Sequence, residues 1–351
     1  MTPGMRTRRW AAGPAGRRRL VGAVMIVALA GGLSAACGTG DDEVIRVYTG
    51  RHYDLEAAFV EFSEQTGIAI EFLEGSDPEL RERIVAEGED TEADVFMTVD
   101  VANLAIAAEE GMFREIDSPA LDAAVPANLR DPQGAWYALS LRARTIVHST
   151  ERLAADEVPT TYAELAEPEW QGRVCLRNSS STYTQSLVAA LIAREGEERA
   201  REIVEGWAAN AEILPNDVII LESVAEGLCD VGITNHYYLA RLLEEDPDYP
   251  VGLVWAEQDG GGTHVNVSGA GVTRHADDPE LAQQLLEWLA TDGQSLFVDG
   301  NHEYPVNPDV EPDDLVTTEF GATFVADEID AGEVGGRNAD AVRLLDEAGY
   351  E

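Results

Sequence analysis

Short apolar runs alternate with amphipathic stretches along this 351-residue chain. Short apolar runs are typical of buried strands, whereas apolar residues three or four positions apart indicate helices. The first part of the chain predicts strands at 44–48, 68–72 and 94–98 and helices at 54–66, 77–87 and about 105–110. Asp77 suits the N-cap of the second helix and Pro78 its first helical position. This alternation predicts a parallel sheet covered by helices.

The pattern starts again after residues 132–134. Strands are predicted at 145–147, 173–176 and 230–234, an extended segment at 265–272, a loop at 260–262, and helices after the capping serines 179–181 and at 279–290. Ligand clefts form at the carboxyl ends of strands and between domains. The predicted fold class is therefore α/β, with two lobes and a ligand cleft between them.

The N-terminal segment has the pattern of an export signal. Residues 1–36 contain six arginines and no acid, then a short apolar stretch and small residues before Cys37. This order is typical of a secretory signal, and the apolar stretch is too short for a membrane span. Cys37 resembles the lipidated cysteine of a bacterial lipobox, although Ser34 stands where leucine is usual. Ordinary secretion remains an alternative, and residues 17–19 also allow twin-arginine export.

The composition is strongly acidic. The formal net charge is −42, and removal of the six arginines of the signal takes it to −48; no lysine is present. Such a charge argues against non-specific nucleic-acid binding, which needs a basic surface. A solvated acidic surface, suited to solubility or high salt, explains the acids more simply than a cation-collecting role. Residues 37–43 are polar and predict a short tether.

Two cysteines remain after the signal. Cys175 and Cys229 each lie on or beside a predicted strand. In an exported protein a disulfide is the simplest interpretation of such a pair. Two reduced core residues are the alternative.

Adjacent tyrosines follow the predicted strand 230–234. Neighbouring residues of a strand point to opposite faces, so a core rarely uses two adjacent tyrosines. At a strand-to-helix corner, however, the hydroxyls of Tyr237 and Tyr238 can face one cleft. Phenolate oxygen is a hard, anionic ligand that suits a hard, highly charged cation. The pair therefore suggests a ferric iron site.

Other candidate ligands also follow strands. His52 and Tyr53 come directly after the first strand, and Tyr183 begins the helix after Ser181. Each has another explanation: a cap or surface role for His52, a hydrophobic staple for Tyr53, and a core stripe for Tyr183. Their joint placement at strand ends favours a metal site. The candidate ligands are His52, Tyr53, Tyr183, Tyr237 and Tyr238.

Seven stretches of the chain resemble the ferric-iron-binding proteins of bacterial iron ABC transporters, in their tyrosine-rich branch. The stretches are 48–53, 93–100, 136–144, 177–186, 235–239, 265–271 and 303–308. Their order and spacing cover nearly the whole chain after the signal. The resemblance implies four tyrosine ligands for Fe(III), with His52 as a variable fifth ligand and Arg142 as an arginine near the site. Arg142 could offset the negative charge of four phenolates.

The resemblance also implies an architecture and partners. It implies the type II, two-lobed periplasmic-binding-protein fold, with one lobe from 44–141 plus 273–351 and the other from 142–272. It implies a monomer that delivers iron to an ABC permease and its ATPase subunits. Two positions depart from the family pattern: His236, where a small residue is frequent, and Thr184, where asparagine is usual. His236 could add a donor or point outward.

Two other functions remain open from the sequence. A solute-binding protein for an oxyanion could use Arg142, Arg144 and the helix N-terminus at 179–181, and one for an organic cation could use aromatic and acidic side chains. An exported enzyme could use Tyr or His in acid–base chemistry. The chain lacks a nucleophile elbow, a His-Glu-x-x-His zinc motif and a phosphate loop, and its six histidines are isolated in sequence. We therefore expect no enzyme.

Overall fold

The computed structural model describes residues 7–9, 43–51 and 56–351. Outside them lie most of the predicted signal, Cys37, most of the tether, and the candidate ligands His52 and Tyr53. The strands are β1 Thr7–Arg9, β2 Val44–Thr49, β3 Ala69–Glu74, β4 Val95–Thr98, β5 Tyr137–Ser149, β6 Val174–Arg177, β7 Ala211–Leu214, β8 Val231–Asn235, β9 Val251–Val254, β10 Val265–Val272 and β11 Tyr304–Pro305.

Each of the five predicted helices is present, and the structure adds further α-helices that were not predicted, among them one of 14 residues at Glu197–Asn210. The α-helices are α1 Glu56–Thr66, α2 Asp77–Glu87, α3 Val101–Glu109, α4 Pro119–Ala124, α5 Thr182–Glu195, α6 Glu197–Asn210, α7 Asp217–Glu226, α8 His236–Glu245, α9 Pro279–Ala290, α10 Gln294–Asp299, α11 Asp314–Phe320, α12 Ala331–Gly336 and α13 Asn338–Glu347. Single 3-10 turns occur at Gly88–Asp90, Ala127–Leu129, Glu164–Ala166 and Pro168–Trp170.

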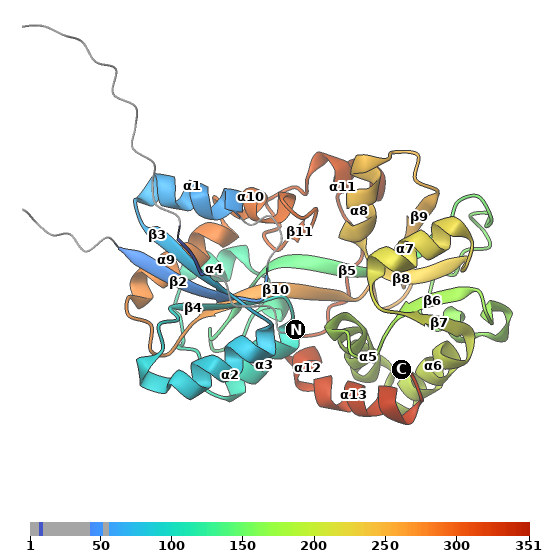
Figure 1. Cartoon of the computed structure of the whole chain (residues 1–351), viewed down its shortest axis with the longest axis horizontal. Coiled ribbons are helices and arrows are strands. Elements are labelled where there is room, and N and C mark those ends of the chain that lie inside the picture. The colour runs from blue at the N-terminus through green and yellow to red at the C-terminus, as the bar shows by residue number, and fades with distance from the viewer. Residues whose placement is uncertain (1–6, 10–42, 52–55) are drawn as a thin grey trace, which may run out of the picture.

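One curled sheet runs through the molecule in the order β1-β3-β2-β4-β10-β5-β8-β6-β7, with β9 and β11 also paired to β5 (Figure 1). The strands β3, β2 and β4 are parallel, as predicted, and form the sheet of the first lobe. The strands β8, β6 and β7 are parallel and belong to the second lobe. The two lobes agree with the pattern of elements predicted from the residues, and the fold is the type II periplasmic binding fold that the family resemblance implied.

Two long strands join the lobes. β5 pairs with β10 through residues 137–143 and with β8 through residues 144–148. β10 in turn pairs antiparallel with β4 in the first lobe. The predicted strand at 145–147 was too short because β5 continues without a break from one lobe into the other. These crossovers place Arg142 and Arg144 between the two halves of the sheet.

The predicted cap of α2 was wrong by one residue. Ser76 is the N-cap, and Asp77 is the first helical residue. The Asp77 side chain is buried, and its Oδ2 accepts a hydrogen bond from the Val99 N–H at 3.1 Å. Burial raises the pKa of Asp77 to about 7. The carboxylate therefore binds the end of β4 and is not available to cap its own helix.

The C-terminal helices contact both halves of the molecule. α11 contacts α8, α12 contacts α3 and α5, and α13 packs along α5. Figure 1 shows α12 and α13 passing from the first lobe to the second along one side. The C-terminal segment thereby connects the lobes a third time.

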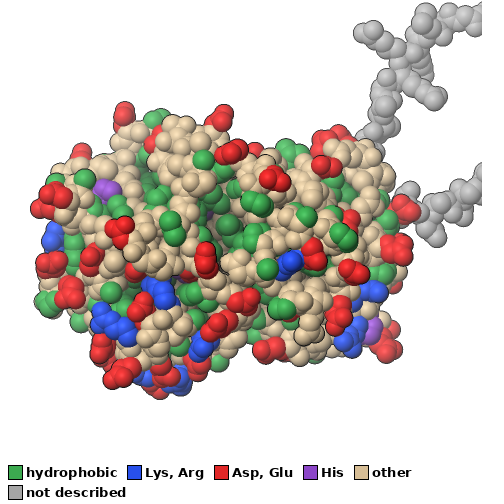
Figure 2. Space-filling view, turned by 180° about the vertical axis from the view of Figure 1, so that it is seen from behind, with side chains coloured by type: hydrophobic (Ala, Val, Ile, Leu, Met, Phe, Trp, Pro, Cys, Tyr) green, Lys and Arg blue, Asp and Glu red, His purple; other side chains and the backbone are tan. Residues whose placement is uncertain are grey.

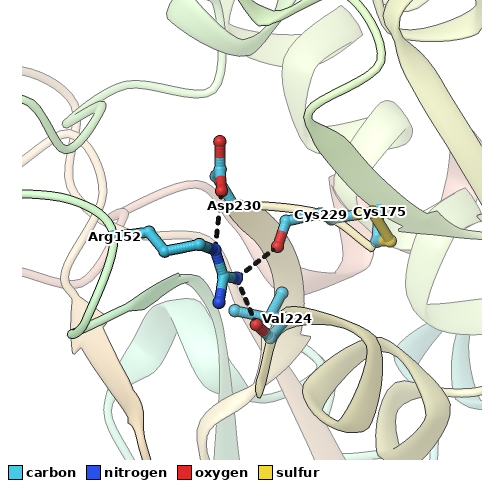
Figure 3. The surroundings of a disulfide bond; sticks show 5 residues. All are labelled: Arg152, Cys175, Val224, Cys229 and Asp230. Carbon is cyan, nitrogen blue, oxygen red and sulfur yellow. Dashed lines mark hydrogen bonds and ion pairs between the residues drawn. A yellow bond between two sulfur atoms is a disulfide. The ribbon is translucent and has the colours of Figure 1, made fainter. Parts of the chain in front are cut away.

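A disulfide stabilises the second lobe. Cys175 in β6 and Cys229 just before β8 are bonded, with Cα atoms 5.8 Å apart and both side chains buried. The disulfide interpretation is therefore confirmed. Figure 3 shows Arg152 beside it: Nη2 donates to the Cys229 carbonyl at 2.8 Å and Nε donates to Asp230 Oδ1 at 2.9 Å. The bond joins the two strands that lead into α5 and α8.

Acidic side chains lie scattered over the face seen in Figure 2, and no single acidic patch covers it. This distribution favours the interpretation of a solvated acidic surface. Across the described ranges, no helix has both the length and the apolar character needed to cross a bilayer.

Candidate metal centre

The tyrosine pair lies at a strand-to-helix corner, as predicted. β8 ends at Asn235, α8 begins at His236, and the tyrosines occupy the first turn. Tyr237 is fully buried and Tyr238 is partly buried, with ring centroids 4.4 Å apart. The guanidinium of Arg241, one turn later, lies 5.3 Å from the Tyr237 centroid and 5.8 Å from the Tyr238 centroid. The corner therefore groups two phenols with one positive charge.

Tyr183 reaches the same place from α5. The helix begins at Thr182, and Ser181 Oγ accepts from the Tyr183 N–H at 3.3 Å. The Tyr237 hydroxyl donates to the Tyr183 hydroxyl, with the oxygens 3.3 Å apart. Two oxygen ligands about 2 Å from one ion and at right angles lie about 3 Å apart. The two hydroxyls thus have the separation of neighbouring ligands on one metal ion.

Three arginines surround the Tyr183 ring. The guanidinium carbons of Arg142, Arg144 and Arg177 lie 5.5, 5.9 and 4.8 Å from its centroid. All three distances are within the range of cation–π contacts. Nearby positive charge also favours the anionic form of an acid. The positive charge of these three guanidiniums would therefore stabilise a phenolate at Tyr183, the form that binds a hard cation.

Asp217, at the start of α7, holds two of these arginines, and sequence reasoning missed it. Its side chain is fully buried and forms ion pairs with Arg144 through Oδ1 and with Arg177 through Oδ2. Arg144 Nη1 also donates to Asn235 Oδ1 at 3.2 Å, and Asn235 Nδ2 lies 3.4 Å from the Tyr237 hydroxyl. The carboxylate therefore connects to the tyrosines through Arg144 and Asn235.

Arg142 links the first lobe to the tyrosines. Its Nη2 donates to the carbonyls of Val99, at the end of β4, and of Val267, the latter at 2.8 Å. Burial lowers the pKa of this guanidinium, but electrostatic interaction with Tyr183 and Glu303 raises it by a larger amount. The pKa of Arg142 therefore lies above its ordinary value. Arg142 stays charged. Because Arg142 and Arg144 donate to protein acceptors, the structure adds no support for the oxyanion interpretation.

Arg51 marks where the first lobe approaches the site. It follows β2, directly before His52, and its Nη1 meets Glu303 Oε2 at 2.6 Å. The same Nη1 lies 3.1 Å from Ser140 Oγ and 2.8 Å from Ser268 Oγ. Burial raises the pKa of Glu303, but Arg51 and Arg142 lower it more, and the net direction is down. A buried ion pair thus fixes the chain one residue before the predicted ligands His52 and Tyr53, which lie outside the described residues.

His236 points inward. The Ala143 N–H donates to its Nδ1 at 3.2 Å, and its Nε2–H donates to the His302 carbonyl at 2.9 Å. Burial lowers the pKa of His236 to about 4, so the ring is neutral at ordinary pH. Both ring nitrogens therefore bind backbone groups. The other departure from the family pattern, Thr184, lies 3.3 Å from the Arg177 carbonyl through its hydroxyl.

The donor chemistry of the described residues is phenolic. In the part of the chain that the structure describes, no three His, Cys, Asp or Glu side chains gather as a group that could hold a metal ion. The tyrosines Tyr183, Tyr237 and Tyr238 converge instead. They fit a hard trivalent cation better than zinc or copper, which favour imidazole and thiolate ligands.

Comparison with known proteins identifies a family and relatives that cover most of the chain. The family model of the bacterial extracellular solute-binding proteins matches residues 90–326. Iron uptake protein A1 of Synechocystis sp. is 37% identical, over 94% of this chain and 97% of the relative.

Two solved structures share the fold. One, from Trichodesmium, was determined in complex with iron and citrate ligands; it is 37% identical, with a TM-score of 0.83, covering 88% of this chain and 100% of that one. The other, Mannheimia haemolytica ferric iron-binding protein A in an open conformation, is 31% identical, with a TM-score of 0.79, covering 88% and 99%. The chain belongs to the family of bacterial extracellular solute-binding proteins.

Proposed function

We propose that this protein is the substrate-binding component of an iron(III) ABC importer. Tyr183, Tyr237 and Tyr238 of the second lobe bind ferric iron, and Tyr53, with His52, completes the ligand set from the first lobe. The observation that carries the proposal is the 3.3 Å separation of the Tyr183 and Tyr237 hydroxyls beside buried guanidiniums. The relatives named for iron uptake and ferric iron binding support it.

Iron capture by phenols releases protons. A free phenol has a pKa of about 10, so the metal must displace the proton from each ligand. Arg142, Arg144 and Arg177 assist this step because their charge favours the phenolate of Tyr183. Affinity therefore decreases as the pH falls, because protons and iron compete for the same oxygens.

Delivery follows from the two-lobed architecture. The crossover strands β5 and β10 supply the hinge, and lobe closure around the ion brings the segment after Arg51 toward the tyrosines. The closed form is then the one that the permease and its ATPase subunits accept. The protein is an exported monomer, attached to the membrane through lipidated Cys37. It performs no catalysis and binds no nucleic acid.

Absorption spectroscopy tests this function. Ferric salt added to the wild-type protein should produce a tyrosinate-to-iron charge-transfer band that saturates at one equivalent. The Tyr237→Phe, Tyr238→Phe double variant should lose the band. Tyr249→Phe, in the loop before β9 and outside the tyrosine cluster, is the matched control and should keep it. A colourless wild-type protein that binds no iron would refute the proposal.

A further inference from the structure

A serine, a histidine and an aspartate form a buried chain of hydrogen bonds behind the tyrosines. Ser186 Oγ lies 2.8 Å from His264 Nε2, and His264 Nδ1 lies 3.0 Å from Asp327 Oδ2. The three side chains come from α5, from the residue before β10, and from the segment between α11 and α12. Their residues are 4%, 1% and 4% exposed. No local sequence pattern predicts this contact, since 63 residues or more separate each bonded pair.

The chain has a defined direction. The Asp327 carboxylate can only accept, so His264 Nδ1 carries the proton and donates it. In the neutral imidazole, His264 Nε2 is then the acceptor for the Ser186 hydroxyl. Each polar atom used in this arrangement has a partner, which a buried network requires. The Ser186 hydroxyl is thereby held in one orientation.

The backbone of His264 is equally constrained. Its N–H donates to the Tyr162 hydroxyl at 3.1 Å, and its carbonyl accepts from the Arg144 N–H at 2.9 Å. Asp327 is fixed beside it, because its own N–H donates to the Thr263 carbonyl at 2.9 Å. The histidine is therefore a fixed point where a crossover strand, the second lobe and the C-terminal segment meet.

Ser186 connects His264 to the helix that carries Tyr183. It lies three residues after Tyr183 on α5, about one helical turn or 4.5 Å along the axis. The bond from Ser186 to His264 thus limits how far the first turns of α5 can slide or rotate. The 3.3 Å contact between the Tyr183 and Tyr237 hydroxyls depends on that position.

The same three residue types also form the nucleophilic centre of many hydrolases. Here the serine lies within a helix, is not presented on a sharp turn, and is buried with both partners. A substrate cannot reach a hydroxyl in that position without displacing packed side chains. The arrangement fits a role in holding α5 better than a role in bond cleavage.

We propose that Asp327, His264 and Ser186 form a positioning relay that holds α5, and with it the phenol of Tyr183, where it can share one ferric ion with Tyr237. The proposal rests on the proposed function and adds three residues that contact no iron. It assigns the C-terminal segment a part in setting the geometry of the site.

Ferric titration of full-length variants, followed by the charge-transfer band, tests the relay. Ser186→Ala and Asp327→Ala should each lower iron affinity about tenfold and shift the band, as for loss of partners that orient metal ligands. Asp327→Asn keeps an acceptor for His264 Nδ1–H and should restore most of the affinity. Ser149→Ala removes a buried hydroxyl that has no hydrogen-bond partner among the described residues, and it should change neither the band nor the affinity.

The outcomes separate the two proposals. A wild-type protein without the band refutes iron binding itself. A normal wild-type band with unchanged affinity and band position in Ser186→Ala and Asp327→Ala refutes the relay, even where urea unfolding shows lower stability. Labelling of Ser186 by a fluorophosphonate that requires His264 also refutes it, in favour of a nucleophile.

Discussion

The two lobes use buried arginine–carboxylate contacts of different composition beside the site. In the first lobe one guanidinium, Arg51, meets one carboxylate, Glu303. In the second lobe Arg144 and Arg177 share the single carboxylate of Asp217. The first pair is neutral overall, and the second group keeps one positive charge. The extra charge lies beside Tyr183, where a phenolate would form.

The difference indicates that the two lobes act at different steps of iron binding. In the second lobe Tyr237 contacts both Tyr183 and Tyr238, with guanidiniums beside the rings, and a disulfide joins two of the lobe's segments. The first lobe fixes the chain at Arg51, one residue before its predicted ligands. We therefore expect the second lobe to collect the ion first and the first lobe to complete the ligand set on closure.

Replacement of Asp217 should have the largest effect. Asp217→Asn leaves the buried guanidinium of Arg144 and the partly buried guanidinium of Arg177 without a counter-charge. Loss of one partner of a buried pair costs about 3–5 kcal/mol. We expect a loss of about 5 kcal/mol in the free energy of unfolding, measured with urea, together with loss of the ferric band. A loss below about 1 kcal/mol would contradict the role of Asp217 as the shared partner.

Removal of the disulfide should follow in magnitude. The Cys175→Ser, Cys229→Ser variant opens a link across 54 residues, for which chain entropy predicts about 4 kcal/mol. We expect that loss in urea unfolding, with the ferric band retained because the tyrosines keep their packing. A lost band in a folded variant would mean that the disulfide also sets the tyrosine geometry.

Glu303→Gln tests the simpler contact of the first lobe. Only Arg51 loses its direct ion pair, and the amide oxygen still accepts from it, so we expect a loss of about 3 kcal/mol. Affinity should fall while the band of the second-lobe tyrosines persists. An effect as large as that of Asp217→Asn would remove the difference between the lobes.

Replacement of His302, at the junction of the lobes, should have a small effect on stability that depends on pH. Its Nδ1 lies 2.7 Å from Asp313 Oδ2, and its Nε2 lies 3.4 Å from Glu244 Oε2 on α8. The hydrogen bond to Asp313 raises the pKa of His302. A raised pKa stabilises the fold below the unfolded-state value of about 6.5, and this stabilisation is lost as pH rises through the folded-state value.

The backbone conformation of His302 decides which substitution is suitable. His302 has φ of +53°, which asparagine tolerates better than most residues. His302→Asn should lose about 1 kcal/mol at pH 5.5 and nothing at pH 9, measured by urea unfolding at both values. Equal losses at the two pH values would show that the ion pair contributes nothing.

The local features of the site could be predicted from the sequence. The corner at Tyr237, the Ser181 cap and the start of α5 follow from patterns within a few residues. The shared partner Asp217 could not be found in the same way, because it lies 73 residues from Arg144 and 40 from Arg177. Arginines in otherwise apolar strands were the available signal, since a buried guanidinium requires a buried acceptor.

The misjudged elements have physical causes. β5 was predicted too short because Ser140, Arg142 and Arg144 interrupt its apolar pattern and hide the single strand that passes from one lobe to the other. Asp77 was assigned to a cap because its alternative partner, the Val99 N–H, comes from the end of a different strand. The histidines are isolated in sequence, yet His264 and His302 each contact a carboxylate in the fold.

The central claim is that the Tyr183 and Tyr237 hydroxyls bind one ferric ion. A crystal structure of the ferric-loaded protein tests it most directly. We expect one iron with both phenolic oxygens about 2 Å away, beside Arg142 and with Tyr238 in the same ligand set. An iron held elsewhere by carboxylates, with the two hydroxyls still bonded to each other, would contradict it.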